Sequence, residues 1–202
     1  MIKFKKDFFA KYIEAFLREN SKVNLISKND EKLLWEKHIF DSLSLSLFFD
    51  KYVMDLSGKT LLDIGTGGGF PSVPLALQYP ELKVFALDSI SKKLKAFDNI
   101  KSELIINNLM TINERAENLN EKFDIVTSRA VGKLDKIAAH GLPLTQKGGY
   151  FVAYKSKSVH EEVENAENII RKQGGKIVEI IPYALPTDEV YERNLVVVKK
   201  II

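Results

Sequence analysis

The stretch Leu61–Pro71, which reads LLDIGTGGGFP, decides the fold. Its first four residues are apolar apart from one acid and predict a strand, its four glycines predict a turn, and Pro71 suits the first turn of a helix. Glycine lets the backbone approach a ligand closely and adopt dihedral angles that are closed to other residues. In open α/β sheets a ligand binds outside the carboxyl ends of the strands. We therefore expect this loop to line a cofactor site.

Beyond this loop, short apolar runs alternate with amphipathic stretches. Strands are predicted at 60–64, 83–87, 110–113, 124–127, 150–154, 176–181 and 194–199, and helices at 73–78, 92–106, 133–142 and 161–173. The β-α-β-α order predicts a parallel sheet with right-handed crossovers. Because no helix separates the last two strands, they predict an antiparallel hairpin at one end of the sheet. The fold class is thus α/β, with a mostly parallel seven-stranded sheet.

The first quarter of the chain shows no strand pattern. Residues 3–20 place apolar side chains at helical spacing between charged ones, and residues 33–50 predict one or two more helices after a break at 24–27. We expect residues 1–57 to form an N-terminal helical cap and residues 58–202 to form the α/β domain. Since neither a repeat nor a long linker separates them, the two parts are expected to share one core.

Composition excludes several classes of protein. The 202 residues predict one domain with an appendage, and the hydrophobic and charged fractions of 45% and 28% are those of a globular protein. The chain has no cysteine, which rules out a disulfide framework, a thiolate zinc site and a cysteine nucleophile. Neither a signal peptide nor an apolar run of about 18 residues is present. We expect a cytoplasmic protein with no membrane segment and no metal.

The spacing of the glycines separates the candidate cofactors. A dinucleotide fingerprint, G-x-G-x-x-G, aligned on Gly65 and Gly67 would put Phe70 at its third glycine. The loop instead resembles the first motif of the S-adenosylmethionine-dependent methyltransferases. Asp63 suits the ammonium of that cofactor, whereas it would repel a pyrophosphate. Asp88 ends the next predicted strand, where an acid accepts from ribose hydroxyls in either cofactor, although it could also cap the following helix.

Further motifs extend this resemblance along the chain. They are Asn24-Leu25, Lys37-His38, Asp41-Ser42-Leu43, residues 65–71, Leu87-Asp88-Ser89 with Lys92-Lys93, Arg115-Ala116-Glu117, Ser128-Arg129-Ala130-Val131 and Tyr154-Lys155. In this order they resemble the glucose-inhibited division protein B family (RsmG), bacterial enzymes that methylate guanine N7 in small-subunit (16S) ribosomal RNA. The resemblance implies a Rossmann-like class I methyltransferase domain over residues 58–202. It also implies S-adenosyl-L-methionine as the cofactor, and 16S ribosomal RNA or the small ribosomal subunit as the partner of a monomeric enzyme.

Three positions depart from the family pattern. Lys37 stands where the family usually has arginine, and Ser72 and Ser156 stand where it usually has glycine. Lysine keeps the charge of arginine but loses its two-pronged hydrogen bonding. The serines affect the detail of two loops and leave the class of protein unchanged.

The resemblance also implies a set of cofactor-binding residues. Gly65 and Phe70 are expected to contact the cofactor, and Ala116 and Glu117 to flank its adenine. The full predicted set is Asp63, Gly65, Gly67, Phe70, Asp88, Ala116, Glu117 and Arg129.

Arg129 and His38 are the candidate catalytic residues. Arg129 follows a predicted strand at its carboxyl end, where the crevice of the sheet is expected; the alternative is an arginine that is solvated or paired with a carboxylate. His38 is a candidate only through its motif position near Asp41, because a lone histidine on a helix is more often structural.

An N7 target suits a chain without an evident acid–base pair. The N7 lone pair of guanine is free and carries no proton, so no base is needed. The tetrapeptide [DNS]-P-P-[YFW], typical of exocyclic amine targets, is replaced by Thr127–Ala130. Seven Lys/Arg and two Asp/Glu in residues 122–159 favour contact with phosphates.

Two other functions stay open from the residues alone. A nicotinamide-dependent dehydrogenase would need a Tyr-x-x-x-Lys pair, and the match at Tyr79 and Lys83 contains Pro80. A non-catalytic RNA-binding module on a methyltransferase scaffold would be expected to lose the acid or the glycines of the loop, which this chain keeps.

Overall fold

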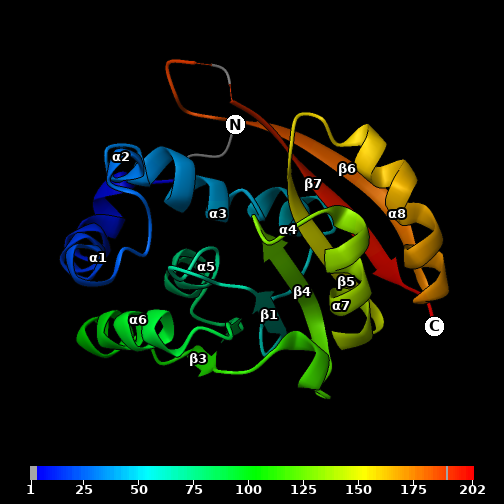
Figure 1. The fold of residues 1–202 in the computed structure, drawn as a ribbon, viewed down its shortest axis with the longest axis horizontal. Coiled ribbons are helices and arrows are strands. Elements are labelled where there is room, and N and C mark those ends of the chain that lie inside the picture. Colours follow the sequence, from blue (N-terminus) through cyan, green and yellow to red (C-terminus); the bar gives the residue numbers. More distant parts are fainter. Residues whose placement is uncertain (1–3, 190) are drawn as a thin grey trace.

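Seven strands form one sheet through the centre of the molecule, as Figure 1 shows for the computed structural model, which describes residues 4–189 and 191–202. The strands are β1 (Thr60–Ile64), β2 (Lys83–Leu87), β3 (Leu109–Ile112), β4 (Phe123–Arg129), β5 (Thr145–Ser156), β6 (Gly175–Leu185) and β7 (Tyr191–Lys200). Their order across the sheet is β3-β2-β1-β4-β5-β7-β6. The first five run parallel, and β7 runs antiparallel to both β5 and β6.

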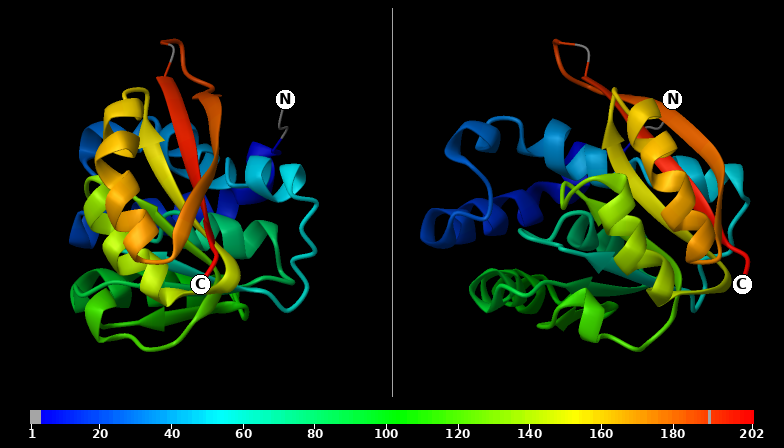
Figure 2. Two further views of the ribbon diagram at one scale, coloured as in Figure 1. Left: turned by 90° about the vertical axis from the view of Figure 1, so that its right-hand side faces the viewer. Right: turned by 45° about the vertical axis from the view of Figure 1, so that its right-hand side comes forward.

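Helices cover both faces of this sheet (Figures 1 and 2). The larger ones in the α/β part are α5 (Ser72–Gln78), α6 (Ser91–Leu104), α7 (Leu134–Leu144) and α8 (His160–Lys172), and the single turn η3 (Ala116–Asn118) follows β3. Helices α5 and α6 lie on one face together with the cap, and α7 and α8 lie on the other. Alternate residues of each central strand therefore point into two different apolar layers, as in parallel sheets that are buried on both sides.

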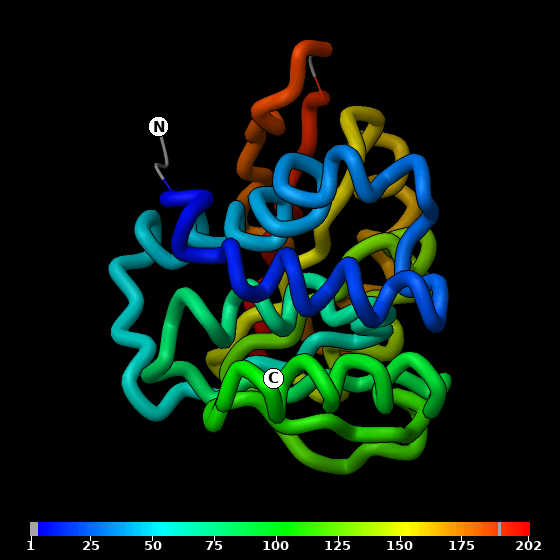
Figure 3. The backbone as a smooth tube through the Cα atoms, turned by 90° about the vertical axis from the view of Figure 1, so that its left-hand side faces the viewer, coloured from blue at the N-terminus to red at the C-terminus, as the bar shows by residue number. Residues whose placement is uncertain are grey.

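The cap consists of six short helical segments. They are η1 (Lys6–Phe9), α1 (Ala10–Val23), α2 (Lys28–Glu31), the π-helix η2 (Leu34–Phe40), α3 (Asp41–Leu43) and α4 (Ser46–Lys51). Helix α1 lies alongside α6, which Figure 3 shows from the cap side. The side chains of Phe9 and Phe16 are fully buried in the same apolar cluster as Leu61 of β1 and Ile125 of β4. One core therefore runs from the cap to the sheet.

The predicted fold class is confirmed, and so is each predicted strand and helix of the α/β part. The predicted start of β5 at residue 150 was wrong, because β5 begins at Thr145. Polar residues and two glycines at 146–149 hide the strand pattern, and the pairing of β4 with β5 is irregular there, shifting its register between Phe123 and Ile125. Across residues 4–189 and 191–202, each helix is too short or too polar to cross a lipid bilayer.

Candidate active site

The glycine loop between β1 and α5 has one open face. Gly65 and Gly67 have φ angles of +72° and +57°, which glycine adopts without strain. A Cβ atom on Gly65 would lie 2.5 Å from Cγ2 of Val131, so a side chain there would collide with the segment after β4. A Cβ atom on Gly67 would meet only the carbonyl oxygen of Gly65, at 3.9 Å. The loop therefore leaves space for a ligand at Gly67.

Asp88, at the end of β2, borders this open face. One of its carboxylate oxygens accepts from the Gly67 N–H at 2.8 Å, and the other accepts from the Ile90 N–H at 2.9 Å. A carboxylate has about four acceptor positions, so capacity remains for two ribose hydroxyls. Asp88 thus supports the backbone before α6 but does not cap that helix, since the N-cap residue Ile90 makes no side-chain cap hydrogen bond. Contact of Asp88 with a nucleoside stays a prediction.

Asp63 lies behind the glycine loop rather than on its open face. Its side chain is fully buried, and its Oδ2 accepts from the Ser72 hydroxyl at 2.7 Å. Ser72 Oγ is also 2.8 Å from Thr66 Oγ1 of the loop. Burial raises the pKa of Asp63 to about 6, against the lowering effect of the Ser72 hydrogen bond. The serine that replaces the family glycine thus supplies a hydrogen bond that anchors the return of the loop into α5.

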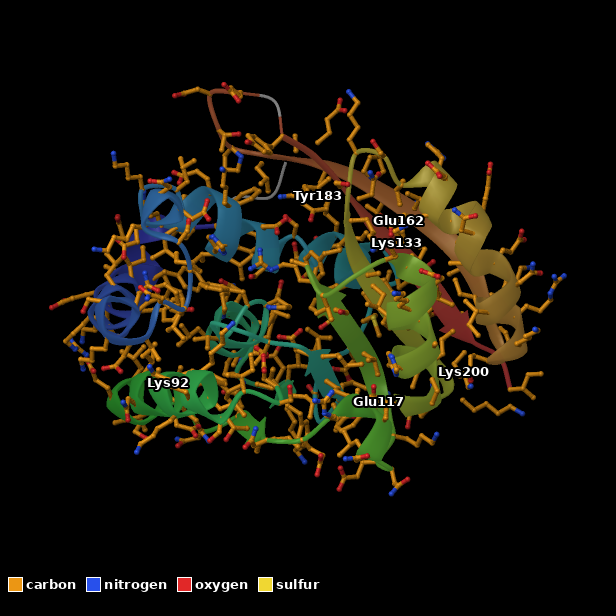
Figure 4. The ribbon with its side chains drawn as sticks, in the orientation of Figure 1. Lys92, Glu117, Lys133, Glu162, Tyr183 and Lys200 are labelled. Atoms are coloured by element: carbon orange, nitrogen blue, oxygen red, sulfur yellow. The ribbon has the colours of Figure 1, made fainter. Side chains whose placement is uncertain are left out.

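Ala116 and Glu117 lie in η3, just beyond the carboxyl end of β3. Ala116 is half-buried and Glu117 is exposed, with its carboxylate 3.8 Å from Nδ1 of His140 on α7. Figure 4 shows Glu117 well apart from Glu162 and Tyr183, which lie at the Arg129 side of the molecule. The structure therefore places this pair on the β3 side of the site and does not bring it to Arg129.

Arg129, the last residue of β4, gathers two of the other predicted site residues, His38 and Phe70, around it. Its Nη1 donates to the Lys37 carbonyl at 3.1 Å and to the Asp41 carboxylate at 2.9 Å. Its Nη2 is 3.2 Å from Nδ1 of His38, and the guanidinium carbon is 5.4 Å from the ring centroid of Phe70. The structure shows Arg129 paired with a carboxylate, that of Asp41, which is one of the alternatives that the sequence left open.

His38 is neutral near pH 7. Burial and the neighbouring Arg129 charge lower its pKa to about 4. Because Nδ1 faces an arginine N–H, it acts as the acceptor, and the ring proton is then on Nε2. Nε2 is buried and has no hydrogen-bond partner in the described part of the chain. The π-helix η2 presents this imidazole and the Lys37 carbonyl to Arg129 together.

Two tyrosines in this cluster have no role predicted from the sequence. The Tyr183 hydroxyl on β6 donates to Asp41 at 2.7 Å, and the Tyr154 hydroxyl on β5 donates to the Ser42 carbonyl at 2.7 Å. Burial and the Asp41 charge raise the pKa of Tyr183 well above its ordinary value. Tyr154 stood in a family motif without an assigned role, and no local signal marks Tyr183, because its contact depends on the pairing of β6 with β7.

A cavity of about 310 Å³ opens beside Arg129. It lies at the carboxyl ends of β4 and β5 and is closed on other sides by the cap and by β6. Its charged lining consists of Arg129, Lys155, Arg193, Asp41 and Glu162.

Lys155 ties three segments of this cavity together. Its side chain is buried, and Nζ donates to the Gly132 carbonyl at 2.7 Å and to Oε2 of Glu162 at 2.6 Å. The same Glu162 oxygen accepts from the backbone N–H of Leu134 at 2.8 Å. The end of β5, the segment after β4 and the first turn of α8 are therefore held in fixed relation.

The cations of residues 122–159 do not form one basic surface. Lys155 is buried and Arg129 is half-buried, and each is held in an ion pair. Lys147 is exposed near the start of β5, at the opposite end of the sheet from the site. Lys133 is exposed at the site end, close to Glu162 in Figure 4. Any phosphate contact near the cavity therefore depends on a smaller set of lysines than the count suggests.

The fold and the site together define a class I S-adenosylmethionine-dependent methyltransferase. Among solved structures, magnesium protoporphyrin IX methyltransferase (ChlM) from Synechocystis PCC 6803 with bound SAM has a TM-score of 0.66 at 18% identity, covering 96% of this chain and 94% of that one. The 16S rRNA (adenine(1408)-N(1))-methyltransferase W203A mutant from Catenulisporales acidiphilia has a TM-score of 0.59 at 13% identity, covering 73% and 87%. At these identities the likeness concerns the fold.

The chain belongs to the GidB family, rRNA small subunit methyltransferase G, whose family model matches residues 5–190. It is 39% identical to Ribosomal RNA small subunit methyltransferase G of Lachnoclostridium phytofermentans, over 96% of this chain and 80% of that protein. It is 37% identical to the protein of the same name from Staphylococcus epidermidis, over 96% and 82%. The family resemblance seen in the sequence motifs is thus confirmed.

Proposed function

We propose that this protein transfers a methyl group from S-adenosylmethionine to N7 of a guanine in 16S ribosomal RNA, acting as a cytoplasmic monomer. Family membership supports the class of substrate. The observation that carries the proposal is the charged cavity beside Arg129, which opens where β4 ends. Ala130 and Gly132 of its lining flank Val131, whose side chain packs against Gly65 of the glycine loop. The proposed division of the chain is a helical cap over residues 1–57 and a methyltransferase domain over residues 58–202.

Held by residues such as Gly67 and Asp88, S-adenosylmethionine would supply a methyl group to the N7 lone pair, with the electron pair of the broken carbon–sulfur bond left on sulfur. Because N7 bears no proton, the protein needs no general base and contributes mainly by positioning. The low pKa of His38 suits this reaction. We propose that His38 is an uncharged hydrogen-bond partner that orients Arg129. Arg129 would in turn lie between the cofactor and the target base.

The predicted cofactor residues divide into two groups by position. Gly67 and Asp88 border the open face of the loop and suit direct contact. Asp63 suits an indirect role, since it holds Ser72 and through it the loop. Gly65, Phe70, Ala116, Glu117 and Arg129 complete the proposed set.

The dehydrogenase alternative lacks support from the fold. Tyr79 directly follows α5 and Lys83 begins β2, so both lie at the amino end of the strand whose carboxyl end carries Asp88. A pair there cannot act on a ligand held by the glycine loop.

Titration calorimetry with S-adenosylhomocysteine tests the cofactor, with NAD as the control ligand. We expect saturable binding of the first and none of the second. Transfer of a tritiated methyl group to small-subunit RNA, followed by mapping of the product, then tests the target atom. Absence of binding at millimolar ligand, or methylation at an atom other than guanine N7, would overturn the proposal.

A further inference from the structure

We propose that Glu162 recognises the target guanine through its Watson–Crick edge and stabilises the positive charge that methylation places on the base. This inference rests on the proposed function and adds a specificity-determining residue to it. Glu162 belongs to the first turn of α8, outside the motifs through which the sequence resembles its family.

The hydrogen bonds of Glu162 leave half of its carboxylate available. Oε2 accepts from both Lys155 Nζ, at 2.6 Å, and the Leu134 N–H, at 2.8 Å. No bond to Oε1 is found within residues 4–189 and 191–202, although the side chain lines the cavity and is only 28% exposed. Because Oε2 is held from two sides, the orientation of Oε1 is fixed as well.

Guanine is the base whose hydrogen-bonding groups match this arrangement. N1–H and the N2 amino group are adjacent donors on its Watson–Crick edge, and a carboxylate accepts both. N7 and O6 are acceptors on the major-groove edge of the base, and N7 is the one farther from the Watson–Crick edge. A guanine that donates to Glu162 therefore turns N7 away from α8, toward the Arg129 side of the cavity.

A second observation points to a ligand in the same cavity. Nε of Arg129 and Nε of Arg193 are buried N–H donors with no hydrogen-bond partner in the described chain. Both arginines line the cavity. Buried donors without partners are costly, and O6 of a guanine, whose lone pairs take no part in the transfer, would offer an acceptor to one of them.

The charge balance of the reaction gives Glu162 a role beyond binding. The purine is neutral before transfer and cationic afterwards, since N7 gains a methyl group without losing a proton. A carboxylate that accepts from N1–H and N2–H attracts the cationic base more strongly than the neutral one. Such an interaction strengthens toward the transition state and so raises the rate of the chemical step.

The test compares Glu162→Gln with Glu161→Gln, the same change one residue earlier on the same helix. Glu161 is exposed and does not line this cavity. The substrates are small-subunit RNAs assembled from two ligated fragments, with guanosine or inosine at the mapped target position; inosine lacks the N2 amino group. For the unchanged protein and for Glu161→Gln we expect kcat/KM to favour guanosine by about 10- to 100-fold, the worth of a hydrogen bond to a charged group.

For Glu162→Gln we expect that preference to fall to within about threefold, because one amide oxygen cannot serve Lys155, Leu134 and the base together. Thermal unfolding and S-adenosylhomocysteine affinity report whether the fold and the cofactor site persist. If the variant shows no turnover, the affinities for 7-methylguanosine 5′-monophosphate and inosine 5′-monophosphate provide the test. The unchanged protein should bind the first more tightly than the second, and Glu162→Gln should show no such difference.

Two failures are distinguishable. A Glu162→Gln variant that keeps the full preference for guanosine, in turnover or in nucleotide binding, overturns the role of Glu162 and leaves the proposed function standing. An unchanged protein that methylates neither RNA overturns the proposed function and this inference with it.

Discussion

Folding shifts the pKa values of two side chains near the glycine loop, His38 and Asp63, in opposite directions. Their contributions to the pH dependence of stability therefore oppose each other. The pKa of His38 falls from 6.5 to about 4 on folding, so between these values the unfolded chain binds the extra proton and stability rises with pH. The pKa of Asp63 rises from 3.8 to about 6, so there the folded chain binds the extra proton and stability falls as pH rises. Over the shared range, about pH 4 to 6, the two contributions largely cancel.

Single substitutions should separate the contributions of His38 and Asp63 to the pH dependence of stability. Relative to His38→Gln, the unfolding free energy of the unchanged protein should increase by about 3 kcal/mol between pH 4 and pH 7. Relative to Asp63→Asn, it should decrease as pH rises through the range from about 4 to 6. Urea unfolding at half-unit pH intervals measures both differences. Curves that stay parallel for either variant would contradict the shift assigned to that residue.

At the scale of elements, the helices that place the active-site groups depend on close contacts that sequence patterns do not record. Gly141 lies inside α7, and a Cβ atom there would be 2.4 Å from Cε2 of the buried Phe151 on β5. Helix propensity alone would favour alanine by about 1 kcal/mol. The overlap is with a ring in the core that has no room to move, so packing should decide the outcome.

Gly141→Ala should therefore destabilise the protein by about 1 to 2 kcal/mol. The overlap at 2.4 Å places the cost in the upper part of the range of about 1 to 3 kcal/mol for overpacking, from which about 1 kcal/mol of helix propensity is subtracted. A lower urea midpoint with an unchanged m-value would show it. Gly132→Ala is the control, because its Cβ atom would meet only Ile137, at 3.8 Å, and surface changes of this kind usually stay within about 0.5 kcal/mol. Equal midpoints for Gly141→Ala and the unchanged protein would contradict the packing argument.

The π-helix η2 marks the limit of what the sequence could predict about elements. Apolar spacing correctly predicted helix over residues 33–50, yet nothing in the spacing indicates a segment with wider turns. That widening sets where the Lys37 carbonyl and His38 meet Arg129. Short π segments of this sort occur often at functional sites, and here tertiary contacts of the cap with β4 accompany it.

At the scale of the whole molecule, the order of strands and the position of the glycine loop followed from the alternation of apolar runs and from one glycine motif. The cavity could not be predicted in this way, because its walls come from the cap, β4, β5, β6, β7 and α8. No local sequence pattern records which of these elements lie together. The roles inferred for Tyr183 and Glu162 depend on these tertiary contacts. The count of Lys and Arg likewise could not tell inward-facing cations such as Lys155 from outward-facing ones such as Lys133.

The distribution of the remaining exposed lysines predicts how RNA is held. Lys133→Glu should weaken the binding of small-subunit RNA and reduce the slope of log K against log salt by about 1, because one phosphate contact is lost at the site end. Lys147→Glu makes the same charge change at the far end of the sheet and should leave both quantities unaltered. Filter binding across a salt series measures them. Equal effects of the two variants would show that RNA does not approach from the cavity side.

The position of β7 sets when, during synthesis, the enzyme becomes competent. β7 follows β6 in the chain but lies between β5 and β6, and β6 joins the sheet only through it. While a nascent chain still lacks β7, both β5 and β6 lack the strand that lies between them in the folded sheet. Tyr183 and Arg193, which close the cavity, are carried by these two strands. A partly made chain could therefore build the glycine loop but not the cavity. Because the proposed function places the target base in this cavity, we expect methyl transfer to begin only after β7 has left the ribosome that made it.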